Sequence, residues 1–249
     1  MEYLTIAVGA ALAGFVQGLS GFAFGMVAMS LWAWTLEPHM AAALTVFGSL
    51  TGQIIAAVRV RRGFDVAALL PFIAGGLAGI PLGMLLLPYL DMASFKTAIG
   101  AFLVLWCPAM LMARRLPPLR WGGRSGDAGA GLVGGVMSAI GGFSGTVPTL
   151  WCTLRGYQKD RQRAIIQNFN LTILMVTMLV YLIAGNVTAE MLPRFAVVAP
   201  AMLIPTLIGA RVYHRIDEAR FRAIVLTLLT ASGVKMLSSG LPTVLGRIG

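Results

Sequence analysis

The chain has 249 residues, of which 58% are hydrophobic and only 11% charged, and its mean hydropathy is +0.84. Soluble domains carry about 25% charged residues, so the composition excludes an ordinary soluble enzyme or binding domain and indicates an all-α, polytopic membrane protein. The net charge of +10 would suggest a nucleic-acid partner in a soluble chain. We expect no nucleic acid here, because basic residues collect in the cytoplasmic loops of membrane proteins.

About eight apolar segments follow one another along the chain. They cover residues 3–36, 40–58, 64–90, 95–113, 128–154, 164–186, 191–210 and 223–241. The stretch from Arg114 to Asp127, with four Arg and two Pro, is the only long linker and predicts a division into repeats 1–113 and 128–249. All nine acidic residues map to segment ends or loops, so we expect no proton relay through a buried carboxylate.

Two of these segments contain residues that break a helix. The first would be about 50 Å long as a straight helix, whereas the hydrocarbon core is about 30 Å thick, and it carries Gly18-Leu19-Ser20-Gly21-Phe22 near its middle. The fifth carries Gly141-Gly142-Phe143-Ser144-Gly145-Thr146-Val147-Pro148. Glycine weakens a helix and proline removes a backbone donor, so both motifs predict a break that protein or a water-filled cavity must surround.

The two halves resemble each other in sequence. Three glycines of the first half (Gly14, Gly21 and Gly25) recur 120 residues later, a register that matches Phe24 with Ser144. A D-x-x-x-F-[KR] pattern at residues 91–96 recurs at residues 217–222. Two matching registers in the same order indicate an internal duplication.

The distribution of basic residues predicts how the halves cross the membrane. If both broken segments enter and leave on one side as hairpins, the loops 59–62, 114–124, 155–163 and 211–222 become cytoplasmic and hold 15 of the 19 Lys and Arg residues. Only Lys96, Arg194, Lys235 and Arg247 then remain outside. Each half becomes one re-entrant hairpin plus three spans, so the halves are predicted to be inverted repeats, which is a transporter architecture.

The hairpin tips are the predicted binding site, with the second arm of each hairpin starting near Phe22 and near Gly145. Helix N-termini favour anions, and hydroxyl and amide side chains can add donors, so a small anion is the expected ligand. The predicted substrate-binding residues are Gln17, Ser20, Gly21, Phe22, Gly141, Gly142, Ser144, Gly145, Thr146, Gln167, Asn168 and Asn170. Cys107 and Cys152 have neither disulfide nor metal spacing, and no cofactor is expected.

Other features have simpler interpretations. Gly75, Gly79 and Gly83 form a stripe for close helix packing. Lys235 is expected to extend its ammonium group to the outer interface, with attraction of an anion as the alternative, and the Arg clusters are expected to set the topology. Four aromatic residues are expected to be interface anchors: Trp32, Trp34, Tyr89 and Trp121.

With these motifs in order, the chain resembles the TauE/SafE family of sulfite exporters, also called the toluene sulfonate uptake permease family. The resemblance lies in the paired Gly-Phe-Ser-Gly-type tips and in the segment from Ile208 through Asp217 to Gly233, and it extends over nearly the whole chain. It implies an inner-membrane permease for sulfite, sulfonates or other small organic anions. The residues by themselves predict an anionic substrate, but they do not indicate that the substrate contains sulfur.

Two other functions are compatible with the sequence. A passive anion channel would share the inverted repeat and the donor-lined centre. Gly142-Phe143-Ser144-Gly145 also resembles the nucleophile motif of rhomboid proteases, but the two histidines, His39 and His214, are placed at span ends, and a serine nucleophile needs a base in contact. Glycine-rich faces could in addition pair protomers into a homo-oligomer.

Overall fold

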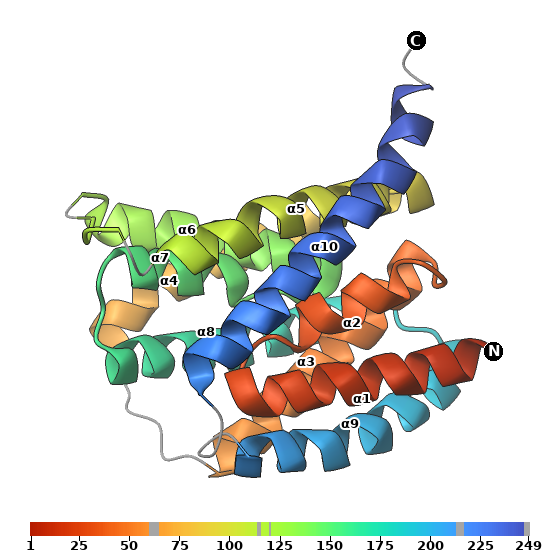
Figure 1. The fold of residues 1–249 in the computed structure, drawn as a ribbon, viewed down its shortest axis with the longest axis horizontal. Helices are drawn as coiled ribbons and strands as arrows, with labels where there is room; N and C mark the ends of the chain where they lie inside the picture. The colour runs from red at the N-terminus through yellow and green to blue at the C-terminus, as the bar shows by residue number, and fades with distance from the viewer. Residues whose placement is uncertain (60–64, 114–115, 120, 213–216, 247–249) are drawn as a thin grey trace.

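A computed structural model describes residues 1–59, 65–113, 116–119, 121–212 and 217–246, and this part of the chain is helical with no strand (Figure 1). His214, Arg247 and part of each of three basic loops (59–62, 114–124 and 211–222) lie outside the described residues. The helices are α1 (Glu2–Ser20), α2 (Phe24–Trp32), α3 (Pro38–Arg59), α4 (Val66–Leu86), α5 (Met92–Ala113), α6 (Gly123–Gly141), α7 (Thr146–Leu154), α8 (Lys159–Ile183), α9 (Leu192–Val212) and α10 (Glu218–Leu245), with short 3-10 turns at Leu87–Tyr89 and Ala189–Met191.

Seven helices within the described ranges are long and apolar enough to cross a membrane: α1, α3, α4, α5, α8, α9 and α10. The remaining helices, α2, α6 and α7, belong to the two predicted hairpins. The protein is therefore an all-α, multi-pass membrane protein, as the sequence predicted. Each half has the same order of elements, a broken helix followed by three long helices; the repeat boundaries at residues 113 and 128 stay a prediction.

The first hairpin consists of α1 and α2. α1 ends at Ser20, and Gly21 takes the left-handed conformation with φ 81°, which glycine adopts without steric cost. The short α2 then runs back along α1. A hydrogen bond of 3.3 Å from the Trp32 indole nitrogen to the Thr5 carbonyl joins the end of α2 to the start of α1. Trp32 is completely buried, so its prediction as an interface anchor is wrong: the indole fills the space between the two arms.

The second hairpin consists of α6 and α7, and Gly142 turns the chain with φ 71°. The Trp151 indole nitrogen donates to Asp127 Oδ1 over 2.7 Å, which fixes the end of α7 beside the start of α6. This corrects two predictions. The hairpin begins at Gly123 rather than at residue 128, and Asp127 lies inside the helix with only 5% of its surface exposed, rather than in a loop.

The register between the tips also differs from the sequence match. The two left-handed glycines are Gly21 and Gly142, which are 121 residues apart rather than 120. Ala23, and not Phe24, therefore stands where Ser144 does. The tip of the second hairpin has three residues between its left-handed glycine and its second arm, against two in the first hairpin, so the second arms begin at Phe24 and at Thr146.

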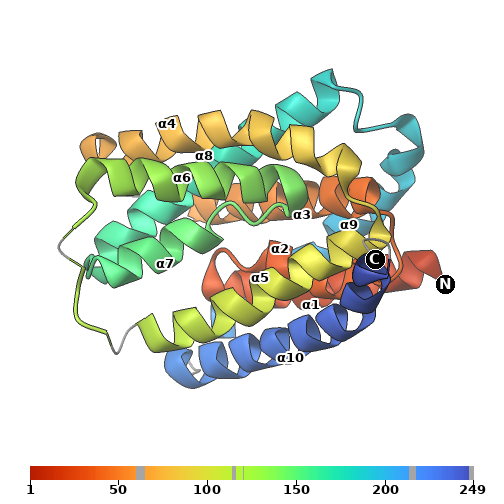
Figure 2. The same ribbon diagram turned by 90° about the horizontal axis from the view of Figure 1, so that it is seen from above.

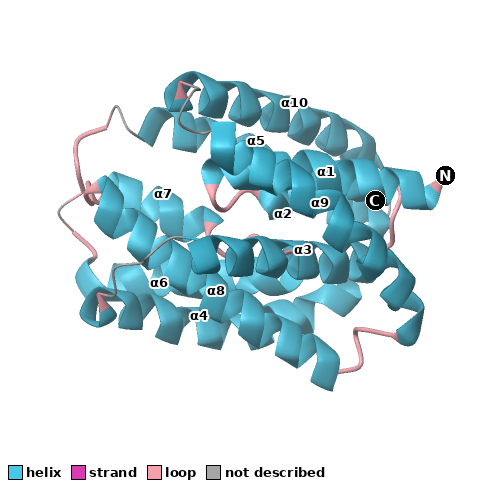
Figure 3. Cartoon of the chain, turned by 90° about the horizontal axis from the view of Figure 1, so that it is seen from below, coloured by secondary structure: helices cyan, strands magenta, loops and turns pink. Residues whose placement is uncertain are grey.

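The two hairpins enter the molecule from opposite faces (Figures 1 and 2). The base of α1–α2 lies at the face that carries Met1, called here the N-terminal face. The base of α6–α7 lies at the other end, where α8 and α10 also begin, called here the basic face because Lys159, Arg161 and Arg163 lie in the first turns of α8. The turns at the two tips lie among the helices, inside the bundle (Figure 3).

Helices of the two halves pack closely through glycines. A β-carbon at Gly75 or Gly79 of α4 would overlap the backbone carbonyl oxygen of Ala128 or Leu132 in α6. The predicted role of the α4 glycine stripe in close packing is confirmed. α4 and α6 run parallel, because Gly75 contacts Ala128, and Gly79, one turn later in α4, contacts Leu132, one turn later in α6.

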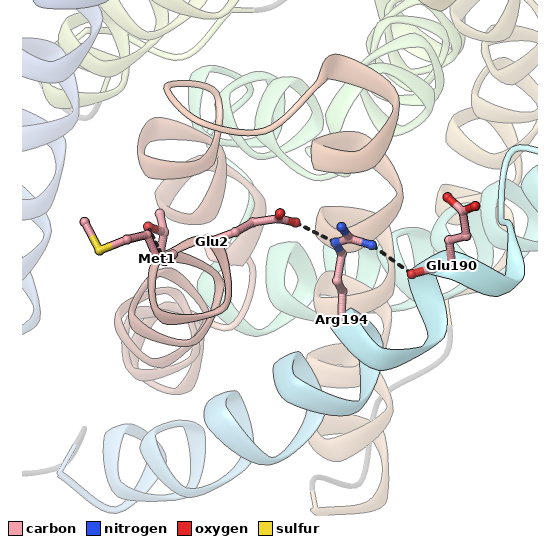
Figure 4. A network of polar contacts seen from close by, with 5 residues as sticks. Met1, Glu2, Glu190 and Arg194 are labelled. Carbon is pink, nitrogen blue, oxygen red and sulfur yellow. Dashed lines mark hydrogen bonds and ion pairs between the residues drawn. The ribbon is translucent and has the colours of Figure 1, made fainter.

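α1 and α9 form a similar parallel pair, in which Gly18 packs on the backbone of Thr206. At the N-terminal face, Arg194 of α9 binds Glu2 of α1, with 2.6 Å between Nε and Oε1, and also donates to the Glu190 carbonyl at 2.8 Å (Figure 4). Each long hairpin arm is thus bound along its length to a helix from the other half of the chain.

Candidate functional site

The tip of the first hairpin is held by side chains of its own first arm. The Ser20 hydroxyl donates to the Val16 carbonyl at 2.8 Å and accepts from the amides of Phe22 and Ala23 at 3.4 and 3.2 Å. Gln17 Oε1 accepts from the Phe24 amide at 3.0 Å. The amides of Phe22, Ala23 and Phe24, which lie at the start of α2 and were expected to be open to an anion, are therefore bound within the tip.

The carbonyl of Gly21 is bound from a third helix. Gln53 of α3 donates its side-chain amide to this oxygen at 2.7 Å, and Gln17 approaches it at 3.5 Å. The tip consequently has one defined conformation in which no main-chain amide from 22 to 24 faces a ligand directly. An anion beside it would still meet the positive end of the α2 dipole, but direct charge must come from other residues.

The tip of the second hairpin is enclosed by protein. The Ser144 hydroxyl donates to Asn170 Oδ1 at 2.9 Å, and the Thr146 hydroxyl donates to the Phe143 carbonyl at 2.8 Å. Ser144 and Thr146 are each only 1% exposed. An amide oxygen cannot act as a general base, so this contact gives Ser144 no activation of the kind that a serine nucleophile requires.

The two tips touch each other. A β-carbon at Gly25 of α2 would lie 2.7 Å from the carbonyl oxygen of Gly142, and Ser49 of α3 donates to the same oxygen at 3.2 Å. The approach is possible only because residue 25 is a glycine. The start of α2 thereby lies against the tip of the second hairpin, and a shared binding site between the two tips stays a prediction.

A cavity of about 280 Å³ lies beside the first tip. Its wall is largely apolar, and its opening at the basic face is lined by Lys159, Arg163 and Arg222 together with Asp160. The residues lining the cavity are Val16, Leu19, Ser20, Gly21, Phe22, Ala23, Met26, Trp106, Met110, Thr149, Lys159, Asp160, Gln162, Arg163, Ile166, Gln167, Phe221, Arg222, Val225 and Leu226. The cavity therefore combines an apolar interior with a positively charged entrance.

The predicted binding residues fall into two groups. Four of them line this cavity: Ser20, Gly21, Phe22 and Gln167. The other eight do not, and they are Gln17, Gly141, Gly142, Ser144, Gly145, Thr146, Asn168 and Asn170. Gln17 lies one layer behind the first tip, and Asn170 belongs to the enclosed second tip. Whether any of the twelve binds substrate stays a prediction.

One aromatic residue lies both in the cavity wall and against the second tip. Trp106 of α5 lines the cavity and donates its indole N–H to the Thr146 carbonyl at 3.0 Å. Its ring stacks on Phe102, which stacks in turn on Phe143, with ring centroids 6.0 and 5.9 Å apart. These stacked rings and the Trp106 hydrogen bond connect the cavity wall to the second tip, and we call them the Trp106 partition.

The sequence reasoning missed the partition and the charged entrance. Lys159, Arg163 and Arg222 had been interpreted as topology determinants, and Trp106 as part of an ordinary span. For Arg222 a signal was present, because it ends the repeated D-x-x-x-F-[KR] pattern. Nothing in the local sequence distinguishes Trp106 from a packing residue.

The comparison with protein families identifies the chain. The family model described as sulfite exporter TauE/SafE matches residues 6–236, which is nearly the whole chain and includes both hairpins. No curated protein and no solved structure matches the chain. Because the match includes residues from all ten described helices, we conclude that this multi-pass membrane protein belongs to the sulfite exporter TauE/SafE family of transporters.

Proposed function

We propose that the protein is an inner-membrane permease that carries a small organic anion, such as an organosulfonate or sulfite, by alternating access between its hairpin tips. The observation that carries the proposal is the cavity at the first tip, with three cationic side chains at its entrance and apolar walls behind them. A cationic entrance attracts anions, and the apolar walls favour an anion with a carbon skeleton over a bare inorganic ion.

The difference between the two tips supports alternating access. The first tip borders a cavity at the basic face, whereas Ser144 at the second tip is closed off by Asn170 and by the Trp106 partition. In an inverted-repeat carrier this is the arrangement expected of a state open to one side. We place the basic face in the cytoplasm, because Lys and Arg residues concentrate there.

The test is counterflow of labelled sulfite in proteoliposomes, competed with toluenesulfonate, methanesulfonate and acetate. We expect saturable exchange, with toluenesulfonate competing better than methanesulfonate because it covers more of the apolar wall. Exchange that rises linearly with concentration would favour the passive channel. A complete lack of exchange or competition for all four anions would contradict the proposal.

Two arginines on the same helix provide a matched pair of variants. Arg163 lines the cavity, whereas Arg161 forms a salt bridge of 3.1 Å with Asp65 and does not. Arg163→Gln should raise the half-saturation concentration about tenfold, which corresponds to about 1.4 kcal/mol of anion binding. Arg161→Gln removes the same charge from the same face and should leave that concentration nearly unchanged, since exposed ion pairs contribute little.

A further inference from the structure

A second hollow of about 280 Å³ lies at the N-terminal face, opposite the first cavity. It is formed by Trp34, by Asp91 and Lys96 at the start of α5, and by Ser239 and Thr243 near the end of α10. The two cavities therefore lie toward opposite ends of the same antiparallel helix pair, α5 and α10. The sequence had suggested an anion-attracting role here only as the alternative for Lys235, and had not indicated a hollow.

Two lysines from different helices meet at the indole of Trp34: Lys96 lines this hollow together with Trp34, whereas Lys235 is not among the lining residues and approaches the same indole. Nζ of Lys96 lies 5.1 Å from the centre of the Trp34 ring, and Nζ of Lys235 in α10 lies 5.7 Å from it. That Lys235 extends its ammonium group to the membrane interface stays a prediction, and in the structure both ammonium groups lie against Trp34. The electron-rich face of the indole attracts both ammonium groups and offsets their mutual repulsion.

The charge balance around the Trp34 indole is positive. Of the basic residues described at this face, Arg194 is neutralised by Glu2, whereas no salt bridge within the described ranges includes Lys96 or Lys235. Asp91 contributes one negative charge, and its Oδ1 accepts from the Ser94 amide at 3.0 Å at the first turn of α5. Two ammonium groups against one carboxylate leave a net attraction for an anion.

The repeated pattern gives this hollow a counterpart at the basic face. Asp217 caps α10 by accepting from the Ala219 amide at 3.0 Å, just as Asp91 caps α5. The basic residue that ends each pattern then points to a cavity: Arg222 lines the cavity at the first tip, and Lys96 lines the hollow at the N-terminal face. The same motif thus supplies one cationic group to each face.

We propose that Trp34, Lys96 and Lys235 form a second oxyanion-binding site, at which the transported anion enters or leaves at the N-terminal face. A sulfonate or carboxylate group would accept hydrogen bonds from the two ammonium groups, and the Trp34 ring would contact its apolar part. The site rests on the proposed permease function. It lies outside the closed Trp106 partition, so it is accessible while the first cavity is open to the basic face.

The test measures transport separately from each face of the membrane. Sealed vesicles of both orientations are prepared, and a protease-cleavable N-terminal tag reports which face is outside. The double variant Lys96→Gln/Lys235→Gln should raise the half-saturation concentration for toluenesulfonate added at the N-terminal face about three- to tenfold. With the anion added at the basic face it should match wild type, and Lys96→Arg/Lys235→Arg should restore wild-type values at both faces.

The outcomes separate this inference from the function on which it rests. If wild type shows no saturable exchange, the permease function fails and the site fails with it. If wild type exchanges anions but the glutamine variant has unchanged half-saturation at both faces, only the second site is refuted. An effect confined to thermal stability, appearing in phosphatidylglycerol but not in phosphatidylcholine vesicles, would assign the lysines to lipid headgroups and would also refute it.

Discussion

The buried carboxylate of Asp127 shows how one residue holds a hairpin together. It lies in the second turn of α6 and accepts the indole N–H of Trp151 from the end of α7. Asp127→Leu would leave this N–H without a partner in a partly buried place, and we expect a loss of about 1–3 kcal/mol of stability. Asp127→Asn keeps an acceptor oxygen and should lose much less. Thermal unfolding in detergent compares the two; equal melting temperatures would show that the hydrogen bond is unimportant.

A pair of glycines tests the packing between α4 and α6. A β-carbon at Gly79 would overlap the Leu132 carbonyl oxygen, whereas a β-carbon at Gly129 would meet nothing within 4 Å. Gly79→Ala should therefore cost about 1–3 kcal/mol through overpacking. Gly129→Ala should be neutral or slightly stabilising, because alanine favours the helix. Size-exclusion profiles after heating measure both variants, and equal tolerance would contradict the close approach of the two helices.

At the scale of elements, the turn of the first hairpin requires the left-handed backbone conformation of Gly21, and it does not require the small volume of glycine. Its φ is 81°, yet the nearest atom to an added β-carbon is Gln167 Nε2 at 3.7 Å. Gly21→Val should cost at least about 1–2 kcal/mol and reduce counterflow, because β-branched residues do not tolerate this conformation. Gly21→Asn, which tolerates it, should retain transport. If both variants behaved alike, the effect would be one of volume at the cavity.

The Trp106 partition is a second element-scale feature. Trp106→Ala would join the cavity to the enclosed tip at Ser144 and remove the hydrogen bond to Thr146. We expect a leak, seen as a non-saturable component of anion flux in proteoliposomes. Trp106→Phe keeps an aromatic ring in the stack with Phe102 and should remain saturable. A strictly saturable alanine variant would show that the partition is not needed.

For the whole molecule, the opposed hairpins require that α8 begins at the basic face and ends at the N-terminal face. Single cysteines at Gln158 and Thr188, both exposed, should react with an impermeant maleimide from opposite sides of the membrane. The two native cysteines are buried and should not interfere. Labelling of both positions from one side would refute the inverted arrangement.

Much of this architecture could be predicted from the sequence because its physical causes are local. A left-handed turn inside an apolar segment needs a glycine, so Gly21 and Gly142 revealed both breaks, whereas the orientation predicted from the basic loops stays a prediction. Which residues are buried was harder to predict from the sequence. Tryptophan occurs both at interfaces and in cores, so Trp32 was misplaced, and Asp127 was assigned to the linker because its partner Trp151 is distant in sequence. The cavity could not be predicted, because its walls come from helices of both halves of the chain.

The central claim is that the cavity at the first tip holds the transported anion. Val16 lines this cavity, and a cysteine there should react with an impermeant maleimide added at the basic face. We predict that toluenesulfonate slows this reaction with a saturable dependence that matches its competition in counterflow. A cysteine at Gln158, on the same face but outside the cavity, should react at an unchanged rate. If no transported anion protects position 16, or if both positions are protected equally, the site is not where this account places it.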